Sequence, residues 1–79
     1  MKYGILIEKI NSKDFPKDYY YAHIPSIGLT THGKGIEGAL SAARDLLILW
    51  IEEKKANNEP IEYSNETYYS VLDLEEYAL

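Results

Sequence analysis

Two histidines, His23 and His32, are the side chains best suited to bind a metal ion or to move a proton. They lie in separate segments of the chain, there is no cysteine, and no helical pair of histidines is present. A zinc site in a protein uses three or four converging nitrogen, sulfur or oxygen ligands. We therefore expect both histidines to be structural or surface residues, and we expect neither a metal ion nor another cofactor.

Hydroxyl and carboxylate side chains offer no assembled catalytic set. Ser26 is predicted in a turn and Ser41 on a helix, and neither belongs to a Ser–His–acid order. The fragment Gly33-Lys34-Gly35 is much shorter than a phosphate-binding loop. Glu8 and Glu37 are too few acids for a two-metal nuclease. The sequence therefore predicts that the protein is not an enzyme.

Tyrosine is the most unusual feature of the composition, since it supplies eight of the ten aromatic residues. In the run Tyr19-Tyr20-Tyr21 the first and third side chains share one face of a strand, and the second takes the other. Tyrosine is enriched at protein interfaces. An exposed tyrosine face therefore has two interpretations: it is either an ordinary solvent-exposed sheet surface or a surface that contacts another protein.

Acidic residues outnumber basic ones by thirteen to eight, which gives a net charge of −5. Nucleic-acid binding through phosphate contacts needs a basic surface, so general binding of this kind is not expected. The acids are concentrated in residues 52–79, which contain eight acidic residues and two lysines. This region is either a solvated acidic tail or a face complementary to a basic partner.

Length and hydropathy indicate a single domain, residues 1–79, in the cytoplasm. The chain has 79 residues, 46% of them hydrophobic and 27% charged, as in ordinary globular domains. Neither a signal-peptide core nor an apolar run long enough to span a membrane is found. Because so short a chain buries little surface, we expect a homo-oligomer (dimer or higher) or a permanent partner.

The hydrophobic pattern changes period once along the chain. Alternation and β-branched or aromatic residues predict strands, whereas apolar positions at helical spacing begin near Ile36. Gly35 is the expected N-cap, and Gly38 in the first turn should weaken the helix. The predicted order is β-β-β-α-β, an α+β fold with one long helix packed on one face of an antiparallel sheet. The strands are predicted at residues 3–10, 19–24, 29–32 and 67–74, and the helix covers about 20 residues before the stop signal at 57–60.

Two motifs in this order resemble the N-terminal domain of HicB-type antitoxins over residues 1–74. The first is a Y-x-A-x-x-P-x-x-G strand and turn, and the second is a glycine followed by a helix with an A-L-x-x-A-x-x-x-L-x-x-W pattern. They are carried by Tyr20, Ala22, Pro25, Gly28, Gly33, Glu37, Ala39, Leu40, Ala43, Leu47 and Trp50. The resemblance implies a partial ribonuclease H fold without the nuclease site. It also implies self-association and neutralisation of a small basic HicA-type mRNA endonuclease toxin.

The resemblance is incomplete at two places. Where the family often has a Ser or Thr helix cap and then an acid, this chain has Gly35 and Gly38. Many such antitoxins also carry a C-terminal DNA-binding domain, for which the residues after Leu74 leave no room. We therefore do not expect direct DNA binding.

An acidic protein can occupy the basic surface of an RNA-cutting toxin through complementary charge and buried aromatic contacts. By position along the predicted strands and loop, we expect the partner-binding residues to be Glu8, Asp14, Asp18, Tyr19, Tyr21 and His23. Two other functions remain open at this point. The chain could be a stand-alone oligomeric scaffold or adaptor, or an acidic nucleic-acid mimic that inhibits a nuclease.

Overall fold

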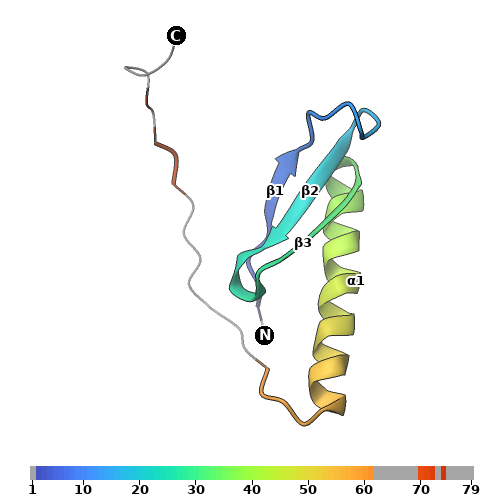
Figure 1. Cartoon of the computed structure of the whole chain (residues 1–79), viewed down its shortest axis with the longest axis vertical. Helices are drawn as coiled ribbons and strands as arrows, with labels where there is room; N and C mark the ends of the chain where they lie inside the picture. The colour runs from blue at the N-terminus through green and yellow to red at the C-terminus, as the bar shows by residue number, and fades with distance from the viewer. Residues whose placement is uncertain (1, 62–69, 73, 75–79) are drawn as a thin grey trace.

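The computed structural model describes residues 2–61, 70–72 and 74. Within them a three-stranded antiparallel sheet is followed by one long helix (Figure 1). This α+β arrangement confirms the predicted fold class for the first four elements. The elements are β1 (Leu6–Lys9), β2 (Tyr19–Ile24), the 3₁₀ turn η1 (Pro25–Ile27), β3 (Leu29–Lys34) and α1 (Gly35–Ala56).

The sheet is a meander with the spatial order β1-β2-β3. Ala22 of β2 is the partner of Ile7 in β1 and of Thr31 in β3, which fixes the register across all three strands. The predicted bounds of β2 are confirmed, whereas β1 is shorter than predicted. The turn after β2 closes at Gly28, whose φ of 66° is in the left-handed region that glycine favours.

β3 continues to Lys34, so the predicted end of this strand at residue 32, before Gly33, was wrong. The reason is a close approach of two backbones. A Cβ added at Gly33 would lie 2.4 Å from the carbonyl carbon and oxygen of Gly38 in α1. Position 33 therefore needs glycine, because a side chain there would push α1 away from β3. Gly38 is the residue of α1 that Gly33 approaches.

The start of α1 also differs from the prediction, because the N-cap is Lys34 and not Gly35. Gly35 has a φ of 69°, and its N–H donates a hydrogen bond to the Asp18 carbonyl oxygen at 2.6 Å. Lys34 makes no capping hydrogen bond with its side chain. The sharp change of direction from strand to helix therefore needs glycine at position 35, and the bond to Asp18 ties it to the loop before β2.

The helix ends where the stop signal predicts. Asn57 is the C-cap, and its N–H donates to the Glu53 carbonyl oxygen at 3.1 Å. Lys54 and Lys55 lie in the last turn, where positive charge is favourable to the helix dipole. The Lys54 ammonium is also 2.9 Å from the Glu59 carboxylate.

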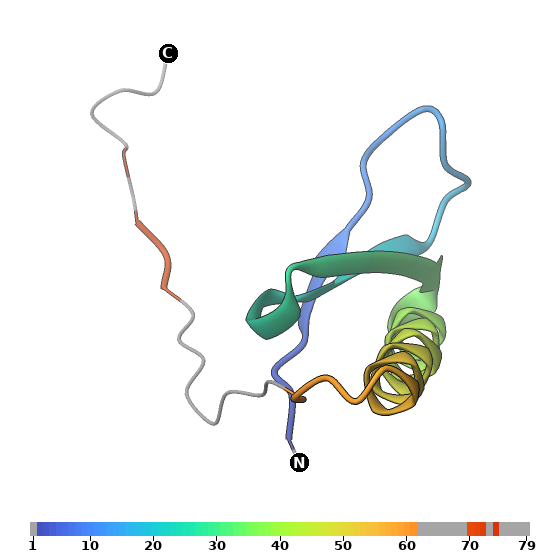
Figure 2. The same cartoon turned by 60° about the horizontal axis from the view of Figure 1, so that its bottom comes forward.

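The core lies between α1 and the strands β2 and β3, and it is made mainly of small side chains. Ala22 and Ile24 of the sheet and Ala39 and Ala43 of the helix are all at most 1% exposed. Figure 2 shows that the helix covers one side of the sheet, and it packs mainly on β2 and β3. Alanines at the contact let the helix and the sheet approach closely. Partly buried side chains surround this centre, namely Tyr3, Ile5, Ile7, Tyr20, Ile27, Leu46 and Leu47.

The fourth predicted strand, residues 67–74, is not seen in the described part of the chain. Residues 67–69 and 73 lie outside the described residues, and 70–72 and 74 belong to no strand. The side chains of Val71, Leu72 and Leu74 are 73%, 83% and 60% exposed. Strand propensity measures how well a residue fits a pleated, half-buried surface. Within the described residues, 70–72 and 74 pair with none of the three strands.

Among the described residues, α1 is too polar to cross a membrane and no other helix is long enough.

Candidate protein-binding face

The sheet has one side that α1 does not cover, which we call the open face (Figure 2). Strand alternation decides its members, because residues two apart share a face. In β2 the helix side receives Tyr20, Ala22 and Ile24, so the other residues of β2 lie on the open face together with their partners. The open face therefore comprises Leu6, Glu8, Tyr19, Tyr21, His23, Thr30, His32 and Lys34.

A polar line crosses the three strands on this face. His23 Nε2 lies 2.9 Å from Glu8 Oε1, and His23 Nδ1 lies 3.0 Å from Thr30 Oγ1. An ionised carboxylate only accepts hydrogen bonds, so Nε2–H is the donor to Glu8. The Glu8 side chain is 65% exposed, and such a pair adds little to stability. Its effect is to hold the imidazole ring in one orientation across the sheet.

An aromatic cluster lies next to this line and is centred on Phe15. The Phe15 ring comes from the loop between β1 and β2, and its centroid is 5.1 Å from His32 and 5.9 Å from Tyr21. Both contacts are edge-to-face, a geometry that aromatic pairs prefer. Tyr19 is 6.2 Å from Phe15, and Tyr21 is 5.7 Å from His23. We call Phe15, Tyr19, Tyr21 and His32 the Phe15 cluster. The contact between Tyr21 and His23 joins this cluster to the polar line.

The β1–β2 loop holds Phe15 over the strands through short local contacts. The Asp14 and Phe15 N–H groups donate to the Ser12 side-chain and carbonyl oxygens, at 3.2 Å and 3.3 Å. Ile10 is only 6% exposed and lines a hollow beneath the loop together with Phe15. One apolar residue below the loop and one in it therefore anchor this otherwise polar segment.

Four of the six predicted partner-binding residues lie together on the open face, namely Glu8, Tyr19, Tyr21 and His23. Asp14 lies in the loop beside Phe15, and it too is exposed. Asp18 lies at the end of the same loop, where it lines the hollow that contains Phe15 and also borders a second hollow with Lys34 and Glu37 at the start of α1. Its φ of 68° and the bond from Gly35 give it a role in the backbone turn.

Sequence reasoning missed Phe15 and His32 as members of this face. The signal for Phe15 was present, since it is the only phenylalanine of the chain and lies in a loop of polar residues. An apolar ring in such a loop must pack on something. The position of His32 follows only from the register, which places it directly opposite Tyr21.

Most residues of the two motifs serve packing in this structure, whereas Glu37 and Leu40 are exposed. Tyr20, Ala22, Gly33, Ala39 and Ala43 meet between the sheet and the helix. Pro25 and Gly28 form the turn η1. Trp50 packs edge-to-face on Tyr3, with ring centroids 6.4 Å apart. The motif therefore accounts for the scaffold, and the open face is a separate set of residues.

The chemistry available on the open face is recognition by stacking, hydrogen bonding and one carboxylate. Within the described ranges, no group of three His, Asp or Glu residues is placed to share a metal ion. Comparisons with protein-family models, with curated proteins and with solved structures find no match to this chain.

Proposed function

We propose that the protein is an antitoxin of the HicB type, which binds a small basic HicA-type mRNA endonuclease through its open face and neutralises it. It would do so in the cytoplasm, as a homo-oligomer of a partial ribonuclease H fold. The observation that carries the proposal is the open face, where the Phe15 cluster joins an oriented histidine–carboxylate pair.

The rings of the Phe15 cluster suit a contact surface because they are already held in place. Tyr21 contacts both Phe15 and His23, so its ring loses little rotamer freedom when a partner covers it. Large, rigid aromatic side chains are the residues that most often dominate binding energy. The centre of a contact through this face is therefore Tyr21, which has ring neighbours on two sides.

The charge of the chain fits a basic partner. With a net charge of −5, the protein attracts a cationic protein at long range and speeds its association. The open face itself carries the carboxylate of Glu8, which is more than half exposed, and the ammonium of Lys34, so the excess of acids lies elsewhere in the chain, in residues 52–79. An acidic protein whose exposed face is aromatic complements the kind of surface with which an RNA-cutting enzyme holds its substrate.

The test is co-expression of the chain with a small basic protein encoded directly beside it, where there is one, followed by an RNA-cleavage assay with the purified proteins. We expect the wild-type chain to suppress cleavage and Tyr21→Ala to bind the toxin about tenfold or more weakly, as for a central aromatic contact. Leu49→Ala is the matched control, because Leu49 is 64% exposed on α1, away from the open face. Circular dichroism of both variants reports whether they are folded.

Three results would contradict the proposal. Equal neutralisation by folded Tyr21→Ala and wild type would remove the open face as the binding site. Recovery of the chain without any basic RNA-cutting partner would favour an oligomeric scaffold. Capture of a different nuclease that is blocked by charge mimicry would favour a decoy. Light scattering at micromolar concentration separately tests the expected homo-oligomer, which a clean monomer would exclude.

A further inference from the structure

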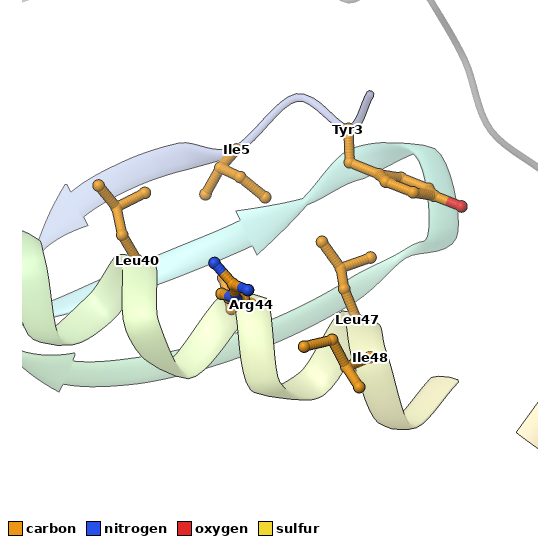
Figure 3. Close-up of a pocket in the computed structure, with 7 residues that line it drawn as sticks. Tyr3, Ile5, Leu40, Arg44, Leu47 and Ile48 are labelled. Atoms are coloured by element: carbon orange, nitrogen blue, oxygen red, sulfur yellow. The ribbon is translucent and has the colours of Figure 1, made fainter. Parts of the chain in front are cut away.

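An apolar groove lies on the helix side of the sheet, between α1 and the N-terminal segment. Tyr3 and Ile5 form one wall, and Leu40, Leu47 and Ile48 of α1 form the other. Figure 3 shows these side chains facing one another, with Arg44 between Leu40 and Leu47. We call this feature the helix groove. It is on the opposite side of the sheet from the open face and shares no residue with it.

The helix groove exists because α1 is placed off centre on the sheet. The helix packs mainly on β2 and β3 and barely on β1. Leu40 and Ile48 consequently remain 43% and 41% exposed. Within the described residues, β1 pairs with β2 alone, so its outer edge is unpaired beside the groove. An unpaired edge and an apolar groove side by side are features that proteins usually cover.

Arg44 restricts what can cover the groove. Its guanidinium lies among apolar side chains in Figure 3, so the occupant should combine apolar residues with an acid. A second copy that paired groove to groove about a twofold axis would bring its own Arg44 near this one. Such like-charge contact is unfavourable. The chemistry thus favours an acidic, apolar peptide segment over the same groove of another copy.

The C-terminal part of this chain has that composition. Val71, Leu72 and Leu74 are the most exposed large apolar side chains of the described residues apart from Leu49. In sequence they are interleaved with and followed by Asp73, Glu75 and Glu76. We propose that residues 70–76 dock into the helix groove of their own chain and cover it. In an extended segment Leu72, Leu74 and Glu76 share one face, which would bring two leucines into the groove and a carboxylate to Arg44.

The connection is long enough for docking within one chain. Figures 1 and 2 both show that residues 57–61 turn back from the end of α1 toward the N-terminal segment, which contributes Tyr3 and Ile5 to the groove. The next nine residues can span about 30 Å when extended, about the length of the 22-residue helix. A tethered segment also has a high effective concentration at a nearby site. These facts favour the segment of the same chain over that of a second copy.

The test uses disulfide formation, since the chain has no cysteine of its own. One variant carries Ile48→Cys with Leu74→Cys, because Leu74 is on the face turned to the groove, and its matched control carries Leu49→Cys with Leu74→Cys. Positions 48 and 49 are at the same height on α1, but only Ile48 lines the groove. We expect the intramolecular disulfide to form about tenfold or more faster in the Ile48 pair, because docking raises the local concentration. The rates are measured by mass spectrometry under mild oxidation.

Two outcomes would overturn the proposal. Equal intramolecular rates in the two pairs would mean that the segment does not dwell at the groove. Disulfide-linked dimers as the main product of the Ile48 pair would mean that the groove takes a segment of a second copy.

Substitutions in the Ile48 pair then identify the docking contacts. Leu72→Asp should return the rate to that of the Leu49 control, while Ser70→Asp should leave it within about twofold, since Ser70 is polar already. Arg44→Glu should slow it by about threefold, the effect expected for one exposed charge pair. An unchanged rate with Leu72→Asp would refute docking through the leucines.

Discussion

The two faces of this sheet are built from the same strands by opposite means. On the helix side, β2 presents Ala22 and Ile24, both fully buried under α1. On the open face the neighbouring residues Tyr21 and His23 are only partly buried, and ring contacts and hydrogen bonds hold them. One face is therefore closed by small side chains in close contact, and the other is open and rigid through aromatic contacts. The difference separates the residues that make the fold from those available for binding.

Truncation at adjacent positions of β2 should give the largest contrast between the faces. Ile24→Ala should lower the free energy of unfolding by about 3 kcal/mol, because it leaves a cavity at the largest fully buried side chain of the core. His23→Ala should lower it by about 1 kcal/mol or less, since the ring is partly exposed and its hydrogen bond goes to an exposed carboxylate. Urea denaturation measures both values. Similar losses at the two positions would contradict the division of the sheet into a closed and an open face.

Glycine substitution should show how tightly the closed face is packed. Gly33→Ala should cost about 2–3 kcal/mol, because its Cβ would meet backbone atoms of Gly38, which cannot rotate away. Gly28→Ala is the control with open space around it, and it should cost about 1 kcal/mol for its left-handed φ. Thermal or urea unfolding compares the two variants. A cost at Gly33 no greater than at Gly28 would show that α1 can shift away from β3 without loss.

Sequence patterns could predict the scaffold because it depends on local signals. Each of these signals depends on residues that are close together in the sequence. They are the strand alternation at Tyr19-Tyr20-Tyr21, the proline–glycine turn and the helical spacing from Ala39 onward. The extension of β3 through Gly33 could not be predicted, because the reason is a contact with Gly38 across two elements. Glycine reads locally as a break, and only the tertiary packing shows that it permits close approach.

The open face was predictable only in part, for the same physical reason. Alternation places Tyr19 and Tyr21 on one side of β2 without knowledge of the partners. The pairing of Glu8 with His23 requires the register between β1 and β2, and the packing of Phe15 requires the path of the loop. Neither the register nor the path of the loop is determined by residues that are close together in the sequence. Residues that act through cross-strand contacts are therefore the ones that a linear pattern leaves out.

The smallest expected effect concerns Glu8, and it distinguishes a role in binding from a role in stability. Glu8→Gln keeps the shape of the side chain and can still accept a hydrogen bond from His23, but it removes the charge. The free energy of unfolding should change by about 0.5 kcal/mol or less, because the carboxylate is 65% exposed. If the open face binds a basic partner, the variant should associate several-fold more slowly at low salt and dissociate at a nearly unchanged rate. Stopped-flow association at two salt concentrations tests this, with the exposed helix variant Glu52→Gln as the control for net charge. Equal slowing by both variants would show that the whole acidic surface attracts the partner, and that Glu8 has no particular place in the contact.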